Sequence, residues 1–592
     1  MNADQILAEA RQLLAAGQFA ACVARYDELS RLVPQHPIVQ GERALALTQV
    51  QRESEAIEQA TLALQTAPQS GIAYAAIGIA HHNRNRPDLA VPFLEKAVEY
   101  DPGLIIARQM LALALNNIGR DDEAIQRFEE VVFLQPGHPQ ARFSLAMRDL
   151  ATRKYSTGWR DYEWRWLTAQ LTRPEIPRPR WDGREIRGKS LLVHTEQGIG
   201  DAVQLVRLLP LLKSQYGAKL VFACQKALQP LLRGCLDYID DWFPIDEPAN
   251  INFDTFTPLL ALPTLMKIDE FNLPKQVPYI AADPARVAKW KPIIDAIPGF
   301  KIGIGWQGSA TYIGDAFRSI PLDHFAALAR IPGVTLVSLQ KGFGSEQIAK
   351  LKSVMNVVEL PGLDDDAAFV DTAAVVQHLD LVVSCDSALS HITGALGRPV
   401  WLALSIGHHW LWQKGRDDSP WYPTLRLFRQ TEFMGWPGVF DRMAAVLKDH
   451  LATNATLLPP KPPTDPIHVE IQAGELFDKI TILELKAKRI TDAGKLANVQ
   501  KELASLLKVR DDIVPGSPTL DDLVVQLAEV NEAIWDNEER MRSREAKQEF
   551  GDDFVAGARS TYKNNDRRAA IKRQINELLG SRLIEEKSYG QY

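Results

Sequence analysis

The first 150 residues repeat a pattern of apolar and polar positions that predicts pairs of amphipathic helices. Four prolines recur at intervals of 34 residues: Pro34, Pro68, Pro102 and Pro136. Small residues recur at the same interval: Cys22, Ala56, Ala90 and Ala124. A proline ends a helix because it lacks the N–H donor and its ring clashes with the preceding turn. The pattern therefore predicts stacked helix pairs, each followed by a proline, with small residues where paired helices approach.

This array resembles the tetratricopeptide repeat over residues 1–150. A fifth, degenerate unit is expected to follow, with Gly158 at the small position and the aromatic segment 159–166 capping the stack. Such arrays form curved surfaces that often hold an extended peptide. The resemblance therefore implies a protein or peptide partner. A spacer or a dimerisation element remains the alternative.

Further along, short apolar runs replace the helical period. Residues 189–194 and 219–224 have the length of buried parallel strands and enclose a glycine turn and a helical stretch, which is a βαβ pattern. The pattern restarts near residue 300, with strands expected at 301–306, 335–339, 356–360, 380–384 and 399–404. The sequence thus predicts two α/β lobes.

Five ordered segments of these lobes give a more specific resemblance: HTEQGIGDAVQ, GIGWQGS with FRSIPL, VSLQKG, DLVVSCDSALSHITGALGRPVW and DSPWYPTLRLFRQ. Together they look like the glycosyltransferase region of bacterial tetratricopeptide-repeat proteins, which is similar to the heptosyltransferases of glycosyltransferase family 9. The resemblance implies a GT-B pair of Rossmann-like lobes. It also implies inverting transfer of a sugar from a nucleotide-sugar donor without a bound metal.

The turn Gly198-Ile-Gly-Asp201 follows the first predicted strand, at the edge where open α/β sheets bind ligands. Its glycines permit close approach of a ligand to the backbone. By resemblance to the heptosyltransferases, Asp201 is the catalytic base that deprotonates the acceptor hydroxyl. The alternative is a helix cap, worth about 1 kcal/mol.

A second candidate segment, 386–391, follows the predicted strand 380–384. A helix that starts here would direct free N–H groups and the positive end of its dipole at a diphosphate. The resemblance assigns donor binding to four of its residues: Asp386, Ser387, Ser390 and His391. The alternative for His391 is a packed structural histidine.

The remaining donor-side candidates follow two other predicted strands: Gly305, Trp306, Gln307, Gly308, Arg318, Gln340 and Lys341. Arg318 would neutralise the leaving diphosphate as its charge develops. A solvated surface arginine is the alternative. Lys341 offers a second basic group. The tryptophans near residues 401–421 are expected to pack, although one could stack on the nucleobase.

Composition excludes several classes of protein. The net charge of -7 is spread along the chain, without the basic face that nucleic-acid binding requires. The four cysteines form no CxxC pair, so neither a disulfide framework nor a metal site is expected. The acidic run 364–366 fits the start of a helix better than a metal site. No cofactor is expected. The N-terminus has no signal-peptide pattern and no apolar run spans a membrane, which favours the cytoplasm.

The last part of the chain begins with a stiff, proline-rich linker. Charged amphipathic helices are expected beyond it, and they closely resemble a family of uncharacterised bacterial proteins. This part would serve docking or oligomerisation. Glu475, Asp478 and Lys479 cluster there without a physical case for a site. The expected domains are 1–166 (repeats), 167–295 (acceptor-side lobe), 296–455 (donor-side lobe), 456–466 (linker) and 467–592 (helical domain).

The fold class predicted for the whole chain is multidomain α and α/β. The predicted function is an inverting glycosyltransferase whose acceptor is a protein, such as a surface or flagellar subunit, recruited by the repeats. A saccharide or lipopolysaccharide-core acceptor is the alternative within the enzyme class. The other alternative is a scaffold whose lobes do not catalyse.

Overall fold

A computed structural model describes residues 2–168, 171–245, 252–269, 271–312, 314–460, 471–581 and 583 of the 592-residue chain. The chain forms two compact units, Met1–Pro462 and Pro463–Tyr592, which are described separately. The expected linker 456–466 is described only as far as residue 460, and 461–466 lie outside the described residues.

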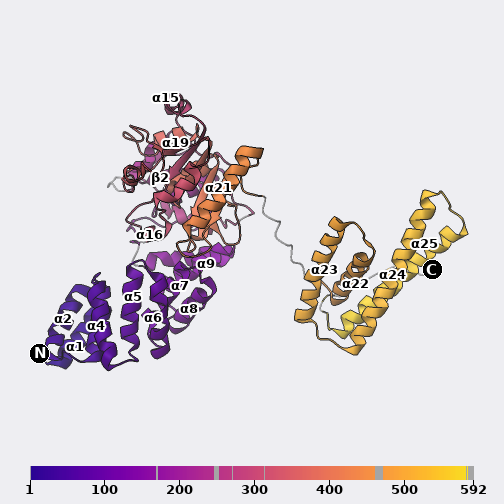
Figure 1. Cartoon of the computed structure of the whole chain (residues 1–592), viewed down its shortest axis with the longest axis horizontal. Helices are drawn as coiled ribbons and strands as arrows, with labels where there is room; N and C mark the ends of the chain where they lie inside the picture. Colours follow the sequence, from indigo (N-terminus) through magenta and orange to yellow (C-terminus); the bar gives the residue numbers. More distant parts are fainter. Residues whose placement is uncertain are drawn as a thin grey trace. The chain divides into compact units, whose positions relative to one another are not determined.

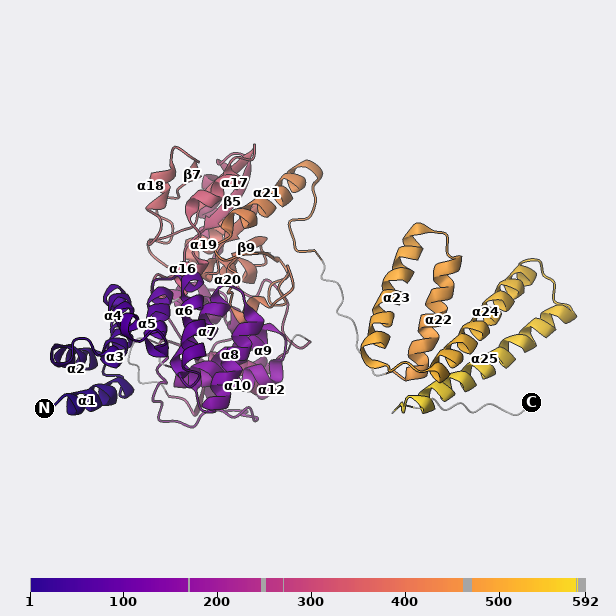
Figure 2. The same ribbon diagram turned by 60° about the horizontal axis from the view of Figure 1, so that its bottom comes forward.

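Stacked antiparallel helix pairs form the N-terminal part of the first unit (Figure 1). Their bounds are α1 (Ala3–Ala15), α2 (Phe19–Leu32), α3 (Pro37–Thr48), α4 (Glu53–Thr66), α5 (Gly71–Asn83), α6 (Pro87–Tyr100), α7 (Ile105–Asn117), α8 (Asp121–Leu134), α9 (Pro139–Ala151) and α10 (Tyr155–Asp161). The 3-10 helix η1 (Tyr162–Leu167) follows. This is the predicted helical solenoid, and Figure 2 shows its helices beside one another in sequence order.

The periodic residues have the structural roles that the sequence predicts. Each of the four prolines lies two residues beyond the last residue of α2, α4, α6 or α8. The periodic small residues are buried in the same helices. In three repeats a side-chain donor six residues after the proline binds the proline carbonyl: Gln40 Nε2 binds Pro34 O at 3.0 Å, Arg108 Nε binds Pro102 O at 2.8 Å, and Arg142 Nε binds Pro136 O. These bonds tie the turn that contains the proline to the helix that follows it.

The first α/β lobe contains a parallel sheet in the order β3-β2-β1-β4. Its strands are β1 (Ser190–His194), β2 (Lys219–Cys224), β3 (Asp241–Pro244) and β4 (Thr255–Pro258). Helical segments connect them: α11 (Ile199–Leu205), η2 (Val206–Leu208), α12 (Leu209–Tyr216), η3 (Lys226–Leu228), α13 (Gln229–Arg233), η4 (Leu259–Ala261) and α14 (Leu262–Leu265). The predicted strands 189–194 and 219–224 are β1 and β2.

The second lobe contains a parallel sheet in the order β10-β9-β8-β5-β6-β7. Its strands are β5 (Phe300–Gly305), β6 (Val334–Ser338), β7 (Val357–Val358), β8 (Leu381–Ser384), β9 (Val400–Leu404) and β10 (Leu425–Arg429). The helical segments are α15 (Pro284–Asp295), α16 (Asp315–Arg318), η5 (Leu322–Phe325), α17 (Ala326–Ala329), α18 (Gln347–Leu351), α19 (Val370–Val376), α20 (Ala388–Ala395), η6 (Trp410–Trp412) and α21 (Trp436–Thr453). The five strands expected in this region are β5 to β9, and β10 is an addition.

The end of the repeat array shares one hydrophobic core with both lobes. Phe143 of α9 and Trp159 of α10 belong to the same buried cluster as Val203 of the first lobe and Leu402 of the second. The Trp159 ring packs edge-on against Trp410, with ring centres 5.0 Å apart. The array is thus built into the transferase-like region through its last helices.

The second unit is a small helical domain that contains α22 (Ala473–Arg489), α23 (Ala493–Ile513), α24 (Pro518–Ala546) and α25 (Asp552–Leu578). Leu527 and Ile575 are central to its apolar core. Asp478 is buried beside that core, where it pairs with Arg568 and accepts a bond of 2.9 Å from Asn531 Nδ2. Asp478 therefore has a structural role in the bundle.

Within the described ranges, no helix is long and apolar enough to cross a membrane. The same residues contain no group of three or more His, Cys, Asp or Glu side chains arranged to hold a metal ion.

Candidate functional site

Both sheets have a topological switch point, where the chain leaves a strand on one side and later returns on the other. In the first lobe this strand is β1, which lies between β2 and β4; in the second lobe it is β5, between β6 and β8. Open α/β sheets bind ligands outside the carboxyl ends of such strands. The predicted segments around Asp201, 305–308 and 386–391 all follow β1, β5 or β8.

The two switch points lie against each other at α11 and α20. A Cβ atom built on Gly200 would lie only 2.7 Å from Cδ2 of His391. A side chain at position 200 would therefore separate the two helices. Gly200 is one of the two glycines that the sequence predicts to let a ligand approach the backbone. It thus also permits contact between the lobes.

Asp201 lies in the first turn of α11, where its Oδ2 accepts a bond of 3.0 Å from the N–H of Gly198. Burial and, to a lesser extent, the nearby Asp386 carboxylate raise the pKa of Asp201 to about 6, against the opposing effects of the Gly198 N–H and Arg318. A carboxylate with this pKa is ionised at neutral pH and can still accept a proton. Asp201 is thus the third residue of α11, where it accepts the N–H of the N-cap residue Gly198, and its raised pKa is compatible with the predicted role of a base.

Arg318 ends α16 and reaches across to the segment after β8. Its Nη1 donates to the carbonyl of Asp386 at 2.9 Å, and its Nε donates to Asp315 Oδ1 at 3.0 Å. Its guanidinium lies 4.3 Å from the centre of the Tyr312 ring. With its side chain only 19% exposed, Arg318 is not a solvated surface arginine.

Close packing holds the guanidinium at the end of β5. A Cβ atom on Gly308 would lie 2.3 Å from Nη2 of Arg318, so only glycine fits there without displacing the arginine. Burial raises the pKa of Asp386, whereas Trp412 and Arg318 lower it. Asp201, Asp386 and Arg318 therefore form one electrostatic cluster across the two lobes.

His391 is buried in α20, where its Nδ1 is 2.9 Å from the hydroxyl of Tyr422. Burial lowers the pKa of His391 to about 3, and His409, Arg207 and Arg318 add to this effect. The imidazole is therefore neutral throughout the physiological range. His391 is packed as a structural histidine would be, although it also touches Gly200 beside the candidate base.

The two serines of this segment differ in orientation. Ser387 is the N-cap residue of α20, and its hydroxyl lies 3.2 Å from that of Ser384. Ser390 is fully buried and donates its hydroxyl proton to the carbonyl of Ser387 at 2.8 Å. The structure thus leaves Ser387 at the helix start and turns Ser390 inward.

The side chains of Gln340 and Lys341, which follow β6, make different contacts. The Gln340 side chain binds the backbone of the segment after β5: its Oε1 accepts from the N–H groups of Trp306 and Gln307, both at 3.1 Å. Lys341 Nζ instead lies 2.5 Å from Asp365 Oδ1, on the turn after β7. The structure therefore does not bring Lys341 to the switch point, and Gln340 acts there through the backbone.

A buried ion pair that the sequence does not predict supports the turn before Asp201. Arg165 of η1, which is fully buried, donates from Nη2 to Glu196 Oε1 at 3.1 Å. The same oxygen accepts the N–H of Leu260, just after β4, at 3.2 Å. Burial raises the pKa of Glu196 to about 7, against the effect of Arg165. The 3-10 helix η1, at the end of the repeat array, thus lies against the segment that follows β1 at the first switch point.

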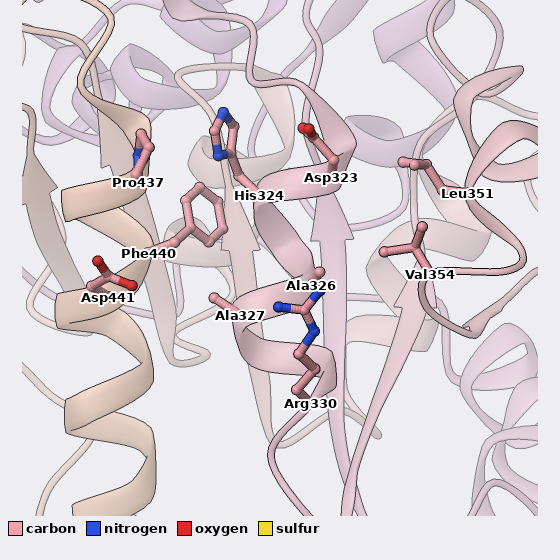
Figure 3. A pocket seen from close by; sticks show the side chains of 10 residues that line it. All are labelled: Asp323, His324, Ala326, Ala327, Arg330, Leu351, Val354, Pro437, Phe440 and Asp441. Atoms are coloured by element: carbon pink, nitrogen blue, oxygen red, sulfur yellow. The ribbon is translucent and has the colours of Figure 1, made fainter.

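A surface pocket of the second lobe lies elsewhere. It has a volume of about 430 Å³ and is formed mainly by η5, α17, α18 and α21 (Figure 3). Its lining residues are Asp323, His324, Ala326, Ala327, Arg330, Leu351, Val354, Pro437, Phe440 and Asp441. None of the predicted site residues belongs to it, so it is separate from the switch points.

Comparison with known families gives three matches along the chain. Residues 72–104 match the tetratricopeptide repeat, and residues 271–404 match "Glycosyltransferase family 9 (heptosyltransferase)". Residues 467–591 match a family of unknown function. The family 9 match includes Arg318 and the 386–391 segment, whereas Asp201 lies outside it. The chain thus combines tetratricopeptide repeats with a glycosyltransferase region.

Three individual proteins are similar to parts of this chain. Protein FlbA of Caulobacter vibrioides is 28% identical over 445 residues, which are 69% of this chain and 72% of that protein. A small glutamine-rich tetratricopeptide repeat-containing protein of Mycosarcoma maydis is 32% identical over 101 residues, 17% of this chain and 29% of that protein. A solved structure of a tetratricopeptide repeat protein of Thermus thermophilus is 18% identical and covers 28% of this chain and 92% of its own, with a TM-score of 0.26.

Proposed function

We propose that this chain is an inverting GT-B glycosyltransferase that moves a sugar from a nucleotide-sugar donor to an acceptor hydroxyl. The observation that carries the proposal is that a carboxylate and a guanidinium lie at the two facing switch points, where α11 and α20 are in contact. Asp201 on the first lobe and Arg318 on the second belong to one electrostatic cluster. A base and a cation are the two groups that such a transfer needs on either side of the anomeric carbon.

In this proposal the acceptor binds beside the first lobe and the donor beside the second. The acceptor oxygen forms its bond to the anomeric carbon while Asp201 takes the hydroxyl proton. The bond between that carbon and the diphosphate oxygen breaks, and its electron pair leaves with the diphosphate. Attack from the side opposite the leaving group inverts the anomeric carbon.

Stabilisation of the leaving diphosphate falls to the second lobe. Arg318 brings a guanidinium whose orientation is fixed by Asp315 and the Asp386 carbonyl. The N-terminus of α20, capped by Ser387, offers backbone N–H groups and the positive end of the helix dipole. Such preoriented charge stabilises the transition state without a reorganisation cost. The proposed transfer therefore uses these groups in place of a metal.

The proposed acceptor is a protein bound by the repeats. Support comes from the contacts between the array and the donor-side lobe. A Cβ atom on Gly119, in the turn between α7 and α8, would lie 2.5 Å from the Ile406 side chain after β9. Lys414 also pairs with Asp121 of α8. A ligand on the array would thus be held close to the lobes, which favours a protein over a free saccharide.

The test begins with a thermal-shift panel of UDP-, GDP-, ADP-, CMP- and dTDP-sugars on the full chain. A ligand at 100 times its dissociation constant stabilises a protein by about 2.7 kcal/mol, which such an assay detects. We expect one nucleotide class to bind and Asp201→Asn to retain that binding while losing transfer. Arg318→Ala is expected to lose donor binding, and Arg330→Ala, on the separate surface pocket, is the matched control.

Three results would contradict parts of the proposal. Equal transfer by Asp201→Asn would remove Asp201 as the base. Transfer to a free saccharide that is unchanged when residues 1–117 are blocked by an antibody would favour the saccharide acceptor. Absence of binding and turnover with the whole panel would favour a scaffold without catalysis.

A further inference from the structure

Phe343 displays an aromatic ring at the carboxyl edge of the second sheet. It lies in the loop after β6, between Gly342 and Gly344, and it is 58% exposed. Both glycines have positive φ, at 71° and 90°, which non-glycine residues rarely adopt. The two glycines thus allow a tight turn, and Phe343 between them exposes a large apolar side chain to solvent.

Several specific contacts hold this loop in place. Gln340 Nε2 donates to the carbonyl of Phe343 at 2.9 Å and to that of Gln307 at 3.2 Å, so one amide ties the two loops together. The indole N–H of the buried Trp306 donates to the carbonyl of Gly344 at 3.1 Å. Phe343 is therefore presented by a braced backbone, which reduces the entropy lost when its ring meets a ligand.

Packing relates this ring to the proposed diphosphate site. A Cβ atom on Gly344 would lie 2.3 Å from Gln307 Oε1, so the Phe343 loop touches Gln307. The next residue, Gly308, packs on the Arg318 guanidinium. Phe343 and Gly308 are thus each one residue away from the contact between Gly344 and Gln307. A nucleoside diphosphate whose phosphates bind at Arg318 would carry its base toward this loop.

The charge distribution along this edge favours the same orientation. Lys341, next to the loop, directs its ammonium to Asp365 and the Leu363 carbonyl. The positive charge at the switch point comes from Arg318, while Phe343 offers a neutral π surface. A ligand with an anionic end and a flat, uncharged end matches this pair of surfaces.

We propose that Phe343 is the stacking platform for the nucleobase of the donor. This inference rests on the proposed glycosyltransferase function and adds a residue and an orientation to it. Every nucleobase has a π face, so stacking contributes affinity with little preference among bases. Selection among nucleotides then belongs to other contacts.

The experiment measures binding by the full chain and its variants with UDP, GDP, ADP, CDP and dTDP, and with inorganic pyrophosphate. Loss of one base–aromatic stack weakens binding by about 5- to 150-fold. For Phe343→Ala we expect a loss in this range for the nucleoside diphosphates and none for pyrophosphate. Phe343→Trp should restore binding, and Arg318→Ala should weaken both kinds of ligand.

Phe271→Ala is the matched control, because Phe271 is 89% exposed and lies outside the loops of the second sheet. Equal nucleoside diphosphate affinity of Phe343→Ala and the unaltered chain would overturn the stacking role and leave the proposed function standing. An equal loss for pyrophosphate would also overturn it, since the ring would then only shape the loop. Absence of nucleotide binding by the unaltered chain would refute the proposed function itself.

Discussion

Replacing Asp201 by asparagine should stabilise the protein at alkaline pH while it abolishes transfer. Asparagine has nearly the same shape and keeps a side-chain oxygen that can accept the N–H of Gly198, now 3.0 Å from Asp201 Oδ2. It lacks the charge, whose burial next to Asp386 raises the pKa of Asp201 from 3.8 to about 6. The charged form of this proposed base is therefore held at a cost in the stability of the folded state.

The size of that cost follows from the pKa. A shift of about 2 units corresponds to roughly 3 kcal/mol at a pH well above 6. Because the folded-state pKa is the higher one, the stability that comes from the protonated carboxyl is fully present below pH 3.8. It is lost as the pH rises through about 6. The variant has no such dependence, so its advantage should be near zero at about pH 4 and greatest at about pH 8.

The assay is thermal unfolding of the full chain followed by tryptophan fluorescence between about pH 4 and pH 8.5, together with transfer activity. Unfolding of a chain with several units is not two-state, so the comparison uses the transition that reports residues 1–462. Asp323→Asn, which makes the same replacement at an exposed carboxylate on η5, is the matched control for the loss of a surface charge. If Asp201→Asn is less stable than the unaltered protein at about pH 8, burial does not destabilise the charged base and the reasoning is wrong.

Three further predictions concern the same region. The rate constant kcat/KM should rise about tenfold per pH unit below about pH 6 and then level off. Asp386→Asn should move this limb to lower pH, because it removes a negative charge near Asp201. Asp323→Asn, on the separate surface pocket, should leave the limb in place. Arg165→Met should lower the free energy of unfolding of the first unit by about 3–5 kcal/mol, because it leaves Glu196 buried without its partner. The double variant Arg165→Met/Glu196→Met should recover most of that loss, and denaturant unfolding measures both effects. Gly119→Ala should lower the midpoint of thermal unfolding more than Gly17→Ala does. Both glycines have positive φ, but only a Cβ atom at position 119 would meet the Ile406 side chain. Equal effects of the two variants would mean that this contact is not close in solution.

The helical array could be predicted in detail because its determinants are local and repeated. A proline ends a helix through its own ring, and a small residue permits close helix packing at each equivalent position. The strands of the two lobes were predictable where they form continuous apolar runs, as β1 and β9 do. The strands β3 and β4 mix polar residues and proline with aromatic residues, and β10 has arginines at two of its five positions, so none of them is a continuous apolar run.

The positions of the site could be predicted better than the orientations within it. Strand ends place the segments after β1, β5 and β8 at the switch points, since all strands of each sheet are parallel. Spacing does not determine which partner a side chain finds. Lys341 follows a strand as expected but pairs with Asp365, and the hydroxyl of Ser390 bonds inside its own helix. Phe343 left no periodic signal because an exposed aromatic in a glycine loop resembles an ordinary surface residue.

Arg207 explains why the two sides of the site should be regarded as one structure. Arg207 follows α11, the helix that carries Asp201. Its buried guanidinium donates to the Trp421 carbonyl of the second lobe at 2.5 Å and to the Tyr279 hydroxyl at 2.7 Å. Tyr279 approaches the Tyr422 hydroxyl at 3.4 Å, and Tyr422 in turn binds His391.

Separating the lobes would break these bonds and leave the guanidinium of Arg207 with its Nε bond to the Gln204 carbonyl as the bond that lies within the first lobe. Each buried charged group left without partners costs about 1–3 kcal/mol or more. The segment between the lobes, which contains Tyr279, is therefore a participant in the contact and not a passive connection. Asp201 precedes Arg207 on the same stretch of helix and is next to Gly200, which contacts His391. The distance between the proposed base and α20 is therefore set by packing across both lobes. The partners of Arg207 lie 72 and 214 residues further along the chain, which is the reason why no local pattern of the sequence could specify this distance.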